Sequence, residues 1–199
     1  ISELATSVKA GTVQRGQRHG GAGQRQLAAM PVDRKGDAQP RRRDEDALIV
    51  HRGRTAYVVL NLYPYNPGHL LVCPYRHVPL YTDTTTEEAA EMAELTQTAM
   101  LALGQAAGAS GYNLGMNQGA VAGAGIAAHL HQHVVPRWTG DGNFLPIIAR
   151  TKNMSQTLGE TRQILADVWD RAARDHAARQ AANARAAAEH PRPGAGGPA

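Results

Sequence analysis

The sequence predicts an α+β fold, with an antiparallel sheet of about five strands, one long helix and a C-terminal helix. Short apolar runs bounded by Gly, Pro and Asn recur along the chain, and such runs are typical of strands. Two longer segments instead place apolar residues three and four positions apart, which indicates amphipathic helices. No internal repeat is evident, so we expect one ordinary domain with tails.

The strands follow from the apolar runs and the turn signals between them. Gly53 divides the first two runs and predicts a hairpin, and the sequence Pro-Tyr-Asn-Pro-Gly at 64–68 is a dense turn signal. A loop of small residues at 118–125 separates the last two runs. Strands are therefore expected at residues 48–51, 55–60, 69–73, 112–117 and 129–136.

The long helix is expected to begin at residues 84–86, where three threonines precede Glu87 and Glu88 in a helix-start pattern. The segment 108–111, which begins and ends with glycine, is expected to end it. Its core face is expected to carry Met92, Leu95, Ala99 and Leu103. A second helix is predicted from Thr157 to about Arg174, with a core side formed by Leu158, Ile164, Leu165, Val168 and Trp169.

Composition divides the chain into residues 1–43, 44–176 and 177–199. The first part has a net charge of +6 and almost no large apolar residues, so we expect a disordered basic tail. The last part is rich in Ala and Arg and then in Pro and Gly; its beginning is expected to continue the preceding helix and its end to form a tail. The middle part is the expected folded domain.

Several partner classes are not expected. The rest of the chain has a net charge of −2, and the basic tail lacks interleaved aromatic residues, so nucleic acid is not the expected partner. No apolar run approaches the roughly 20 residues of a membrane helix, and no N-terminal apolar segment resembles a signal peptide. A single cysteine, Cys73, excludes an internal disulfide, and a cytoplasmic setting is the expectation.

Three histidines, His129, His131 and His133, alternate along the last predicted strand. On a strand they would line one face, about 6–7 Å apart. The small-residue loop 118–125 just before them could bring backbone N–H groups close to a phosphate. Histidine can attack phosphorus as a nucleophile or move protons near neutral pH. From the residues alone, a zinc site, a phosphate-binding module without turnover and a polar strand edge remain alternatives.

The run His-Leu-His-Gln-His-Val-Val at 129–135 resembles the signature of the histidine triad (HIT) family of nucleotide hydrolases and transferases. Residues 61–72 resemble the nucleotide-binding segment of that family, in which a Pro-Gly-His turn joins two strands around the nucleoside. Residues 113–119 are similar to the segment that leads into its glycine loop. The extension at 136–144 resembles the branch that contains actinobacterial diadenosine tetraphosphate (Ap4A) phosphorylases. The resemblance covers about residues 47–170 and implies a HIT-like sheet and a nucleotide-binding catalytic domain over 44–176.

The resemblance also implies roles. His131 would take the nucleotidyl group from the α-phosphate, with one ring nitrogen bonded to a backbone carbonyl and the other aimed at phosphorus. His129 and His133 would bind phosphate oxygens and stabilise charge on the leaving group. The other expected nucleotide-binding residues are Asn61 at the ribose, His69 and Asn117 at the phosphates, the loop residues Gly123, Ala124 and Gly125, Leu62 at the base, and Trp138 as a cover. Plain packing remains the alternative for His69, Leu62 and Trp138.

Three positions depart from the family pattern. Gly125 stands where a Ser or Thr is common, which removes a hydroxyl donor, and Ala124 precedes it where Gly or Gln is common. Gln132 is a polar spacer between the histidines, and it needs either a buried partner or an exposed edge.

The expected function is cleavage at the α-phosphate of a dinucleoside polyphosphate such as Ap4A, followed by attack of inorganic phosphate or water on a nucleotidyl-histidine. No cofactor is required, although Mg²⁺ could accompany a polyphosphate. A homodimer is expected, with the helix from Glu87 to Ala107 as the candidate contact. The alternatives are a hydrolase of nucleoside phosphoramidates or adenylylated small molecules, a nucleotide sensor with little turnover, and a metal-binding protein.

Overall fold

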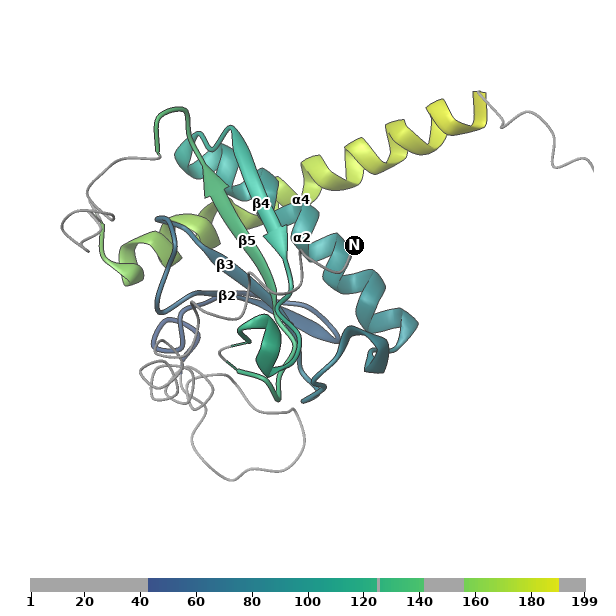
Figure 1. Ribbon diagram of the computed structural model, residues 1–199. Coiled ribbons are helices and arrows are strands. Elements are labelled where there is room, and N and C mark those ends of the chain that lie inside the picture. The colour runs from purple at the N-terminus through teal and green to yellow at the C-terminus, as the bar shows by residue number, and fades with distance from the viewer. Residues whose placement is uncertain (1–42, 125, 142–155, 190–199) are drawn as a thin grey trace, which may run out of the picture.

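The computed structural model describes residues 43–124, 126–141 and 156–189. They form a five-stranded antiparallel sheet in the order β1-β2-β3-β5-β4. The strands are β1 (Ile49–Arg52), β2 (Ala56–Leu60), β3 (Leu70–Pro74), β4 (Gly111–Gly115) and β5 (Gln132–Arg137). Two long helices accompany them, α2 (Thr86–Ala107) and α4 (Leu158–Glu189), with short 3-10 turns η1 (Tyr81–Asp83) and η2 (Ala120–Ala122) in the connections (Figure 1). The predicted α+β architecture is confirmed.

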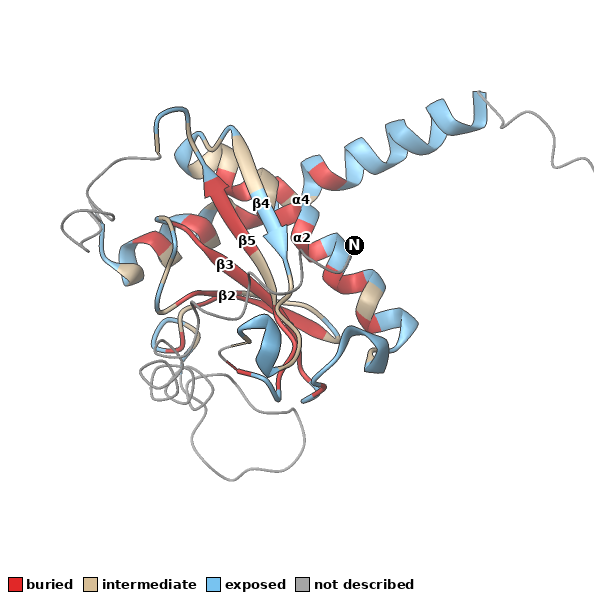
Figure 2. Ribbon diagram, in the orientation of Figure 1, coloured by how far each residue is buried: buried red, intermediate tan, exposed pale blue. Residues whose placement is uncertain are grey.

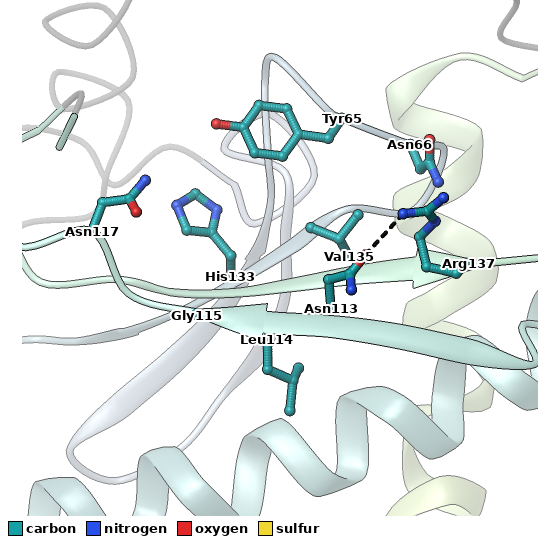
Figure 3. Close-up of a pocket in the computed structure, with 9 residues that line it drawn as sticks. All are labelled: Tyr65, Asn66, Asn113, Leu114, Gly115, Asn117, His133, Val135 and Arg137. Carbon is teal, nitrogen blue, oxygen red and sulfur yellow. Dashed lines mark hydrogen bonds between the residues drawn. The ribbon is translucent and has the colours of Figure 1, made fainter. Parts of the chain in front are cut away.

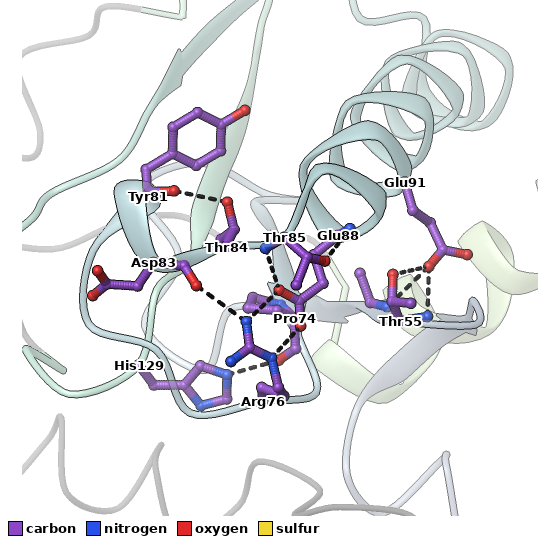
Figure 4. Close-up of polar contacts among 11 residues, drawn as sticks. Thr55, Pro74, Arg76, Tyr81, Asp83, Thr84, Thr85, Glu88, Glu91 and His129 are labelled. Atoms are coloured by element: carbon purple, nitrogen blue, oxygen red, sulfur yellow. Dashed lines mark hydrogen bonds and ion pairs between the residues drawn. The ribbon is translucent and has the colours of Figure 1, made fainter.

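The hairpin at Gly53 is confirmed, and a carboxylate from α2 holds it in place. The buried side chain of Glu91 accepts hydrogen bonds from the backbone N–H groups of Arg54, Thr55 and Ala56 and from the Thr55 hydroxyl (Figure 4). A Cβ atom at Gly53 would lie 2.7 Å from Oε1 of Glu91, so a side chain does not fit there. The glycine therefore allows the carboxylate to tie the turn to the helix.

The predicted start and end of α2 are confirmed. Thr85 caps the helix in a reciprocal capping box with Glu88, and Gly108 ends it in the left-handed conformation with φ of 64°. The acidic side chain of Glu88 also pairs with Arg76 at 2.7 Å, which links the start of the helix to the end of β3 (Figure 4). The predicted apolar face is buried as expected, at Met92, Leu95, Ala99 and Leu103.

The sheet has two different faces because strand residues alternate in direction. One face packs on α2 and α4 and includes Val58, Leu60, Leu70, Val72 and Val134. The other face carries a smaller apolar cluster that includes Ile49, Tyr57, Val59, Leu71 and Cys73. Red ribbon in Figure 2 runs along β2, β3 and much of β5, so these inner strands of the sheet are largely buried.

The helix α4 runs to Glu189, well past the predicted end near Arg174, and so continues through the boundary at 176/177 (Figure 1). Beyond His176 its residues are exposed. Leu165 and Trp169 are buried as predicted, but Ile164 is 37% exposed, so its placement on the core side was wrong. The ring of Trp169 stacks on His51 of β1 at 4.9 Å between centroids, which fixes α4 against the sheet.

Some predictions fall outside the described residues. They are the disorder of residues 1–42, the role of Gly125, the Gly-Asn-Phe segment at 142–144, and the tail at 190–199. Within the described part of the chain, no helix is both long enough and apolar enough to span a membrane.

Candidate active site

The three histidines do not all lie on one strand, so that part of the prediction was wrong. His133 belongs to β5, but His129 and His131 precede it. The ladder between β3 and β5 stops at the pair Val72 and Gln132. Pro74 has no N–H to extend the ladder, and its carbonyl instead accepts a hydrogen bond from Nε2 of His129 at 2.8 Å (Figure 4). The His129 side chain thus takes the place of the next backbone hydrogen bond between β3 and β5.

His131 has its ring fixed by the main chain. Its Nδ1 lies 2.9 Å from the carbonyl oxygen of His129. Because a carbonyl only accepts, Nδ1 carries the proton and Nε2 keeps its lone pair. This is the arrangement predicted for the nucleophile. The His131 ring also meets the His133 ring edge to face, with 4.9 Å between centroids.

His69 and His133 are joined by a series of hydrogen bonds that starts at a backbone N–H. The N–H of Tyr65 donates to Nδ1 of His69 at 3.1 Å, so the proton of His69 is on Nε2. That Nε2 lies 2.9 Å from Nδ1 of His133 and donates to it. The remaining proton of neutral His133 is therefore on Nε2, and His133 can donate that proton to a ligand.

Asn61 also contributes to this series of hydrogen bonds. Its side-chain nitrogen lies 3.1 Å from Nδ1 of His69, and its side-chain oxygen accepts from the N–H of Tyr63 at 3.0 Å. Asn61 is buried. The structure brings His69, His133 and Asn61 together, and it gives the Asn61 amide a positioning contact that sequence reasoning did not anticipate; ribose binding by Asn61 stays a prediction.

Burial keeps two of the rings neutral. Burial, with a smaller contribution in the same direction from the neighbouring His131, lowers the pKa of His133 to about 4. Burial also lowers the pKa of His129, although the hydrogen bond to the Pro74 carbonyl opposes the shift. Both imidazoles are therefore uncharged at neutral pH, which is the form that the tautomer argument requires.

His77 is a neighbour of the triad that sequence reasoning missed. Its exposed ring packs against that of His129, with 4.3 Å between centroids. Among the described residues, Nδ1 of His129 is buried without a hydrogen-bond partner. No periodicity links position 77 to the triad, because the contact depends on how the chain turns after β3.

A cavity of about 390 Å³ opens beside His133, along the strands β4 and β5 (Figure 3). Asn117, a predicted phosphate ligand, lies in its lining next to His133. The lining also includes Tyr65, Asn113 and Arg137, which sequence reasoning did not single out. The alternation of the histidines continues through Val135 to Arg137. The strand pattern could therefore have identified Arg137 as a neighbour of the site.

The glycine loop is a series of tight turns. Gly119 and Gly123 have φ values of 77° and 78°, which favour glycine. The N–H groups of Ala122, Gly123 and Ala124 donate to carbonyls of the same loop. The described part of the loop therefore uses these amides internally, and phosphate binding by Gly123 and Ala124 stays a prediction.

Other predicted positions have packing contacts. Trp138 donates its indole N–H to the carbonyl of Ala107 at 2.9 Å, at the end of α2. Leu62 is half-buried in the turn after β2. Gln132 has the partner that it needs, because its amide donates to the Gly115 carbonyl at 3.2 Å on β4. No group of three or more His, Cys, Asp or Glu side chains within the described ranges is arranged to hold a metal ion.

A family model described as the HIT domain matches residues 42–140, the part of the chain that contains the sheet, α2 and all three histidines. An Ap4A phosphorylase of Mycobacterium tuberculosis is 49% identical over 132 residues, covering 66% of this chain and 68% of that protein. The chain belongs to the HIT family. A bis(5′-nucleosyl)-tetraphosphatase of Schizosaccharomyces pombe is 31% identical over 93 residues, which are 47% of this HIT chain and 50% of that one.

Solved HIT structures have the same fold. A zinc-bound histidine triad family protein of Mycobacterium smegmatis superimposes with a TM-score of 0.53 and 27% identity, covering 62% of this chain and 84% of that one. The family membership indicated by the three resembling segments and the α+β fold predicted from the apolar pattern are thus confirmed.

Proposed function

We propose that this HIT protein is a nucleotidyl transferase that cleaves a dinucleoside polyphosphate such as Ap4A at the α-phosphate and passes the nucleotidyl group to inorganic phosphate. The observation that carries the proposal is the orientation of His131. Its Nδ1–H is held by the His129 carbonyl, so Nε2 presents a lone pair. A nucleophilic ring therefore has its tautomer set before any substrate arrives.

The reaction proceeds in two displacements at phosphorus. In the first, the Nε2 lone pair of His131 forms a P–N bond with the α-phosphorus, the P–O bond to the bridging oxygen breaks, and ATP leaves with that electron pair. In the second, an oxygen of inorganic phosphate attacks the same phosphorus and the P–N bond breaks. ADP leaves, and His131 regains its lone pair. Water in place of phosphate would release AMP.

The neighbouring groups stabilise charge during both steps. Neutral His133 donates from Nε2 to a phosphate oxygen, since Nδ1 accepts from His69. A preorganised donor of this kind contributes about 2–4 kcal/mol to transition-state stabilisation. Asn117 lies beside His133 and adds an amide donor. No resident metal is required in this scheme, and Mg²⁺ would enter with the polyphosphate.

The comparisons support the substrate class. The 49% identical relative is named an Ap4A phosphorylase, and other relatives are named as enzymes that cleave dinucleoside polyphosphates. The first name favours phosphate over water as the acceptor.

Product analysis tests the proposal. Ap4A would be incubated with the protein with and without inorganic phosphate, and the nucleotides resolved by chromatography. ATP with ADP only when phosphate is present is the expected result, and ATP with AMP would indicate a hydrolase. Intact-protein mass spectrometry after a phosphate-free incubation should show an added adenylyl group that His131→Asn lacks. Release of AMP from a phosphoramidate with Ap4A untouched would select the alternative substrate class, and nucleotide binding with neither cleavage nor adduct would indicate a sensor.

We also propose that the protein is a homodimer. The strand β4 has no partner on its outer side within the described sheet, and Asn113, Leu114 and Gly115 are exposed there. Edge strands with open backbone groups readily pair with another chain. Light scattering during size-exclusion chromatography should give twice the chain mass, and Leu114→Pro should shift it to the monomer mass. A monomer for the parent protein would contradict this assembly.

A further inference from the structure

The cavity beside His133 extends the site in one direction only. Its lining includes His133 but not His131, Asn61 or Leu62, which are the residues expected to hold the transferred nucleotide. From His133 it follows β5 past Val135 to Arg137, roughly 13 Å along the strand. A volume of about 390 Å³ is within the usual range for a small-molecule pocket. The space is thus large enough for a second group of the substrate beyond the phosphates.

The charge of this cavity does not suit another phosphate. Arg137 is the one cationic side chain among the lining residues, and Asp141 neutralises it through two contacts of 2.6 and 2.7 Å. The pairing is close enough to hold the pKa of Asp141 down to about 2. The guanidinium also donates to Asn113 at 2.9 Å (Figure 3). Three of its five N–H donors are therefore directed at protein acceptors, and the Arg137–Asp141 pair leaves the lining close to neutral.

The remaining lining suits a nucleoside. The residue Tyr65 is 56% exposed, and its ring lies across the cavity from β4 and β5, in stacking contact with His133 at 5.9 Å between centroids (Figure 3). Asn66 uses its amide nitrogen on the Pro136 carbonyl and on Asp141, so it presents its oxygen as an acceptor. Asn113 and Asn117 add further amides. An aromatic face beside fixed amides is the combination that binds a base and a ribose.

We propose that the cavity formed by Tyr65, Asn66, Asn113 and Arg137 binds the nucleoside of the leaving nucleotide, the half of the dinucleoside polyphosphate that departs when His131 attacks. This assignment rests on the proposed function, in which the substrate has a nucleoside at each end of the polyphosphate. The cavity would then distinguish a dinucleoside polyphosphate from a nucleoside polyphosphate of equal length, because only the former has a second nucleoside to place there.

Equilibrium binding tests the assignment without turnover. The background is His131→Asn, and calorimetry compares Ap4A with adenosine 5′-tetraphosphate, which has the same four phosphates but lacks the second nucleoside. We expect Ap4A to bind more tightly, and Tyr65→Ala to weaken Ap4A about tenfold, as loss of one base–aromatic stack does. Adenosine tetraphosphate should bind Tyr65→Ala within twofold of its affinity for the parent. The control is Tyr81→Ala, which removes another exposed tyrosine, one that does not line the cavity.

Each outcome decides between the two proposals. Equal affinity of the parent for both ligands, or an equal loss for both on Tyr65→Ala, would overturn the assignment, since the cavity would then hold no second nucleoside. Failure of the protein with an intact His131 to cleave Ap4A would instead contradict the proposed reaction, and it would leave the preference for Ap4A measurable. A loss of affinity for both ligands on Arg137→Gln, with neither affinity changed by Tyr65→Ala, would show that the cavity binds a phosphate and would overturn the assignment.

Discussion

The two faces of the sheet are built from different chemistry. The face toward α2 and α4 is aliphatic, with Leu60, Leu70 and Val134 packed against the helices. The opposite face carries imidazoles, of which His69 and His131 are buried. Apolar contacts fix the side chains of the first face. The imidazoles of the second face are fixed by hydrogen bonds to the main chain and to one another. The residues that stabilise the fold and the residues expected to carry out the reaction therefore lie largely on opposite faces of the sheet.

The largest effect expected on the histidine face is on catalysis alone. His131→Asn removes the proposed nucleophile, so we expect the cleavage rate of Ap4A to fall by about 10⁴-fold or more. The free energy of unfolding should change by less than about 1 kcal/mol, since an amide can still donate to the His129 carbonyl. Steady-state kinetics and urea denaturation measure the two effects. A variant that retains a tenth of the parent rate would exclude His131 as the nucleophile.

The largest effect expected on stability alone comes from the helix side. Burial raises the pKa of Glu91, but hydrogen bonds from Thr55, Arg54 and Ala56 outweigh it and hold the pKa below its ordinary value. Glu91→Gln turns an –NH₂ group toward these donors, so we expect a loss of about 2–4 kcal/mol in unfolding free energy. The exposed Glu94 on the same helix is the matched control, and Glu94→Gln should change stability by less than about 0.5 kcal/mol. Equal denaturation midpoints for the two variants would contradict the role of Glu91.

The buried imidazole of His133 should make the stability of the protein depend on pH. The pKa of His133 is about 4 in the folded protein, below its ordinary value of 6.5. Between these two values the unfolded chain binds more protons, so stability should decrease as the pH falls from about 6.5 to about 4. The contribution of His133 to this decrease is expected to be about 3 kcal/mol over the whole interval. His133→Gln should flatten the curve by that amount in urea titrations at several pH values, and a parallel curve for the variant would refute the assignment.

The smallest effect is expected at the first residue of β5, Gln132. Gln132 lies between the histidines and donates to Gly115 and to the carbonyl of His133. Both acceptors are backbone carbonyls near the surface, so Gln132→Leu should change stability by less than about 1 kcal/mol. The rate of Ap4A cleavage should stay within threefold of the parent. A large loss of rate would show that Gln132 positions His133, which the comparison between the faces does not predict.

Much of the fold was predictable because its signals are local. Thr85 and Gly108 bound α2 through capping and left-handed geometry, and both effects depend on neighbouring residues. The end of α4 was not predictable from apolar spacing, because its exposed continuation to Glu189 lacks an apolar face and depends on helix propensity in an Ala-rich segment. Ile164 was misplaced for a related reason, since the core side of α4 also includes the small and polar residues Ala172 and His176.

The candidate site was predictable in its residues but not in its geometry. The alternating histidines, with Asn61 and His69, follow from sequence pattern and family resemblance. The departure of His129 from the strand depends on Pro74, which is distant in sequence and adjacent in space. The contacts of His77 and Tyr65 with the triad rings likewise depend on the paths of two turns. Periodicity within one segment does not encode such contacts between segments.

The hydrogen bond from the Tyr65 amide to His69 has a consequence for how this site can vary among related chains. The proton positions on His69 and His133 are selected by this peptide group together with the Asn61 amide, and every amino acid except proline supplies the peptide N–H. Drift at position 65 could therefore change which nucleotides are accepted while the tautomers stay the same. Proline there would remove one of the two donors to Nδ1 of His69 and leave the Asn61 amide as the other, so the choice of protonated nitrogen would then depend on a side chain.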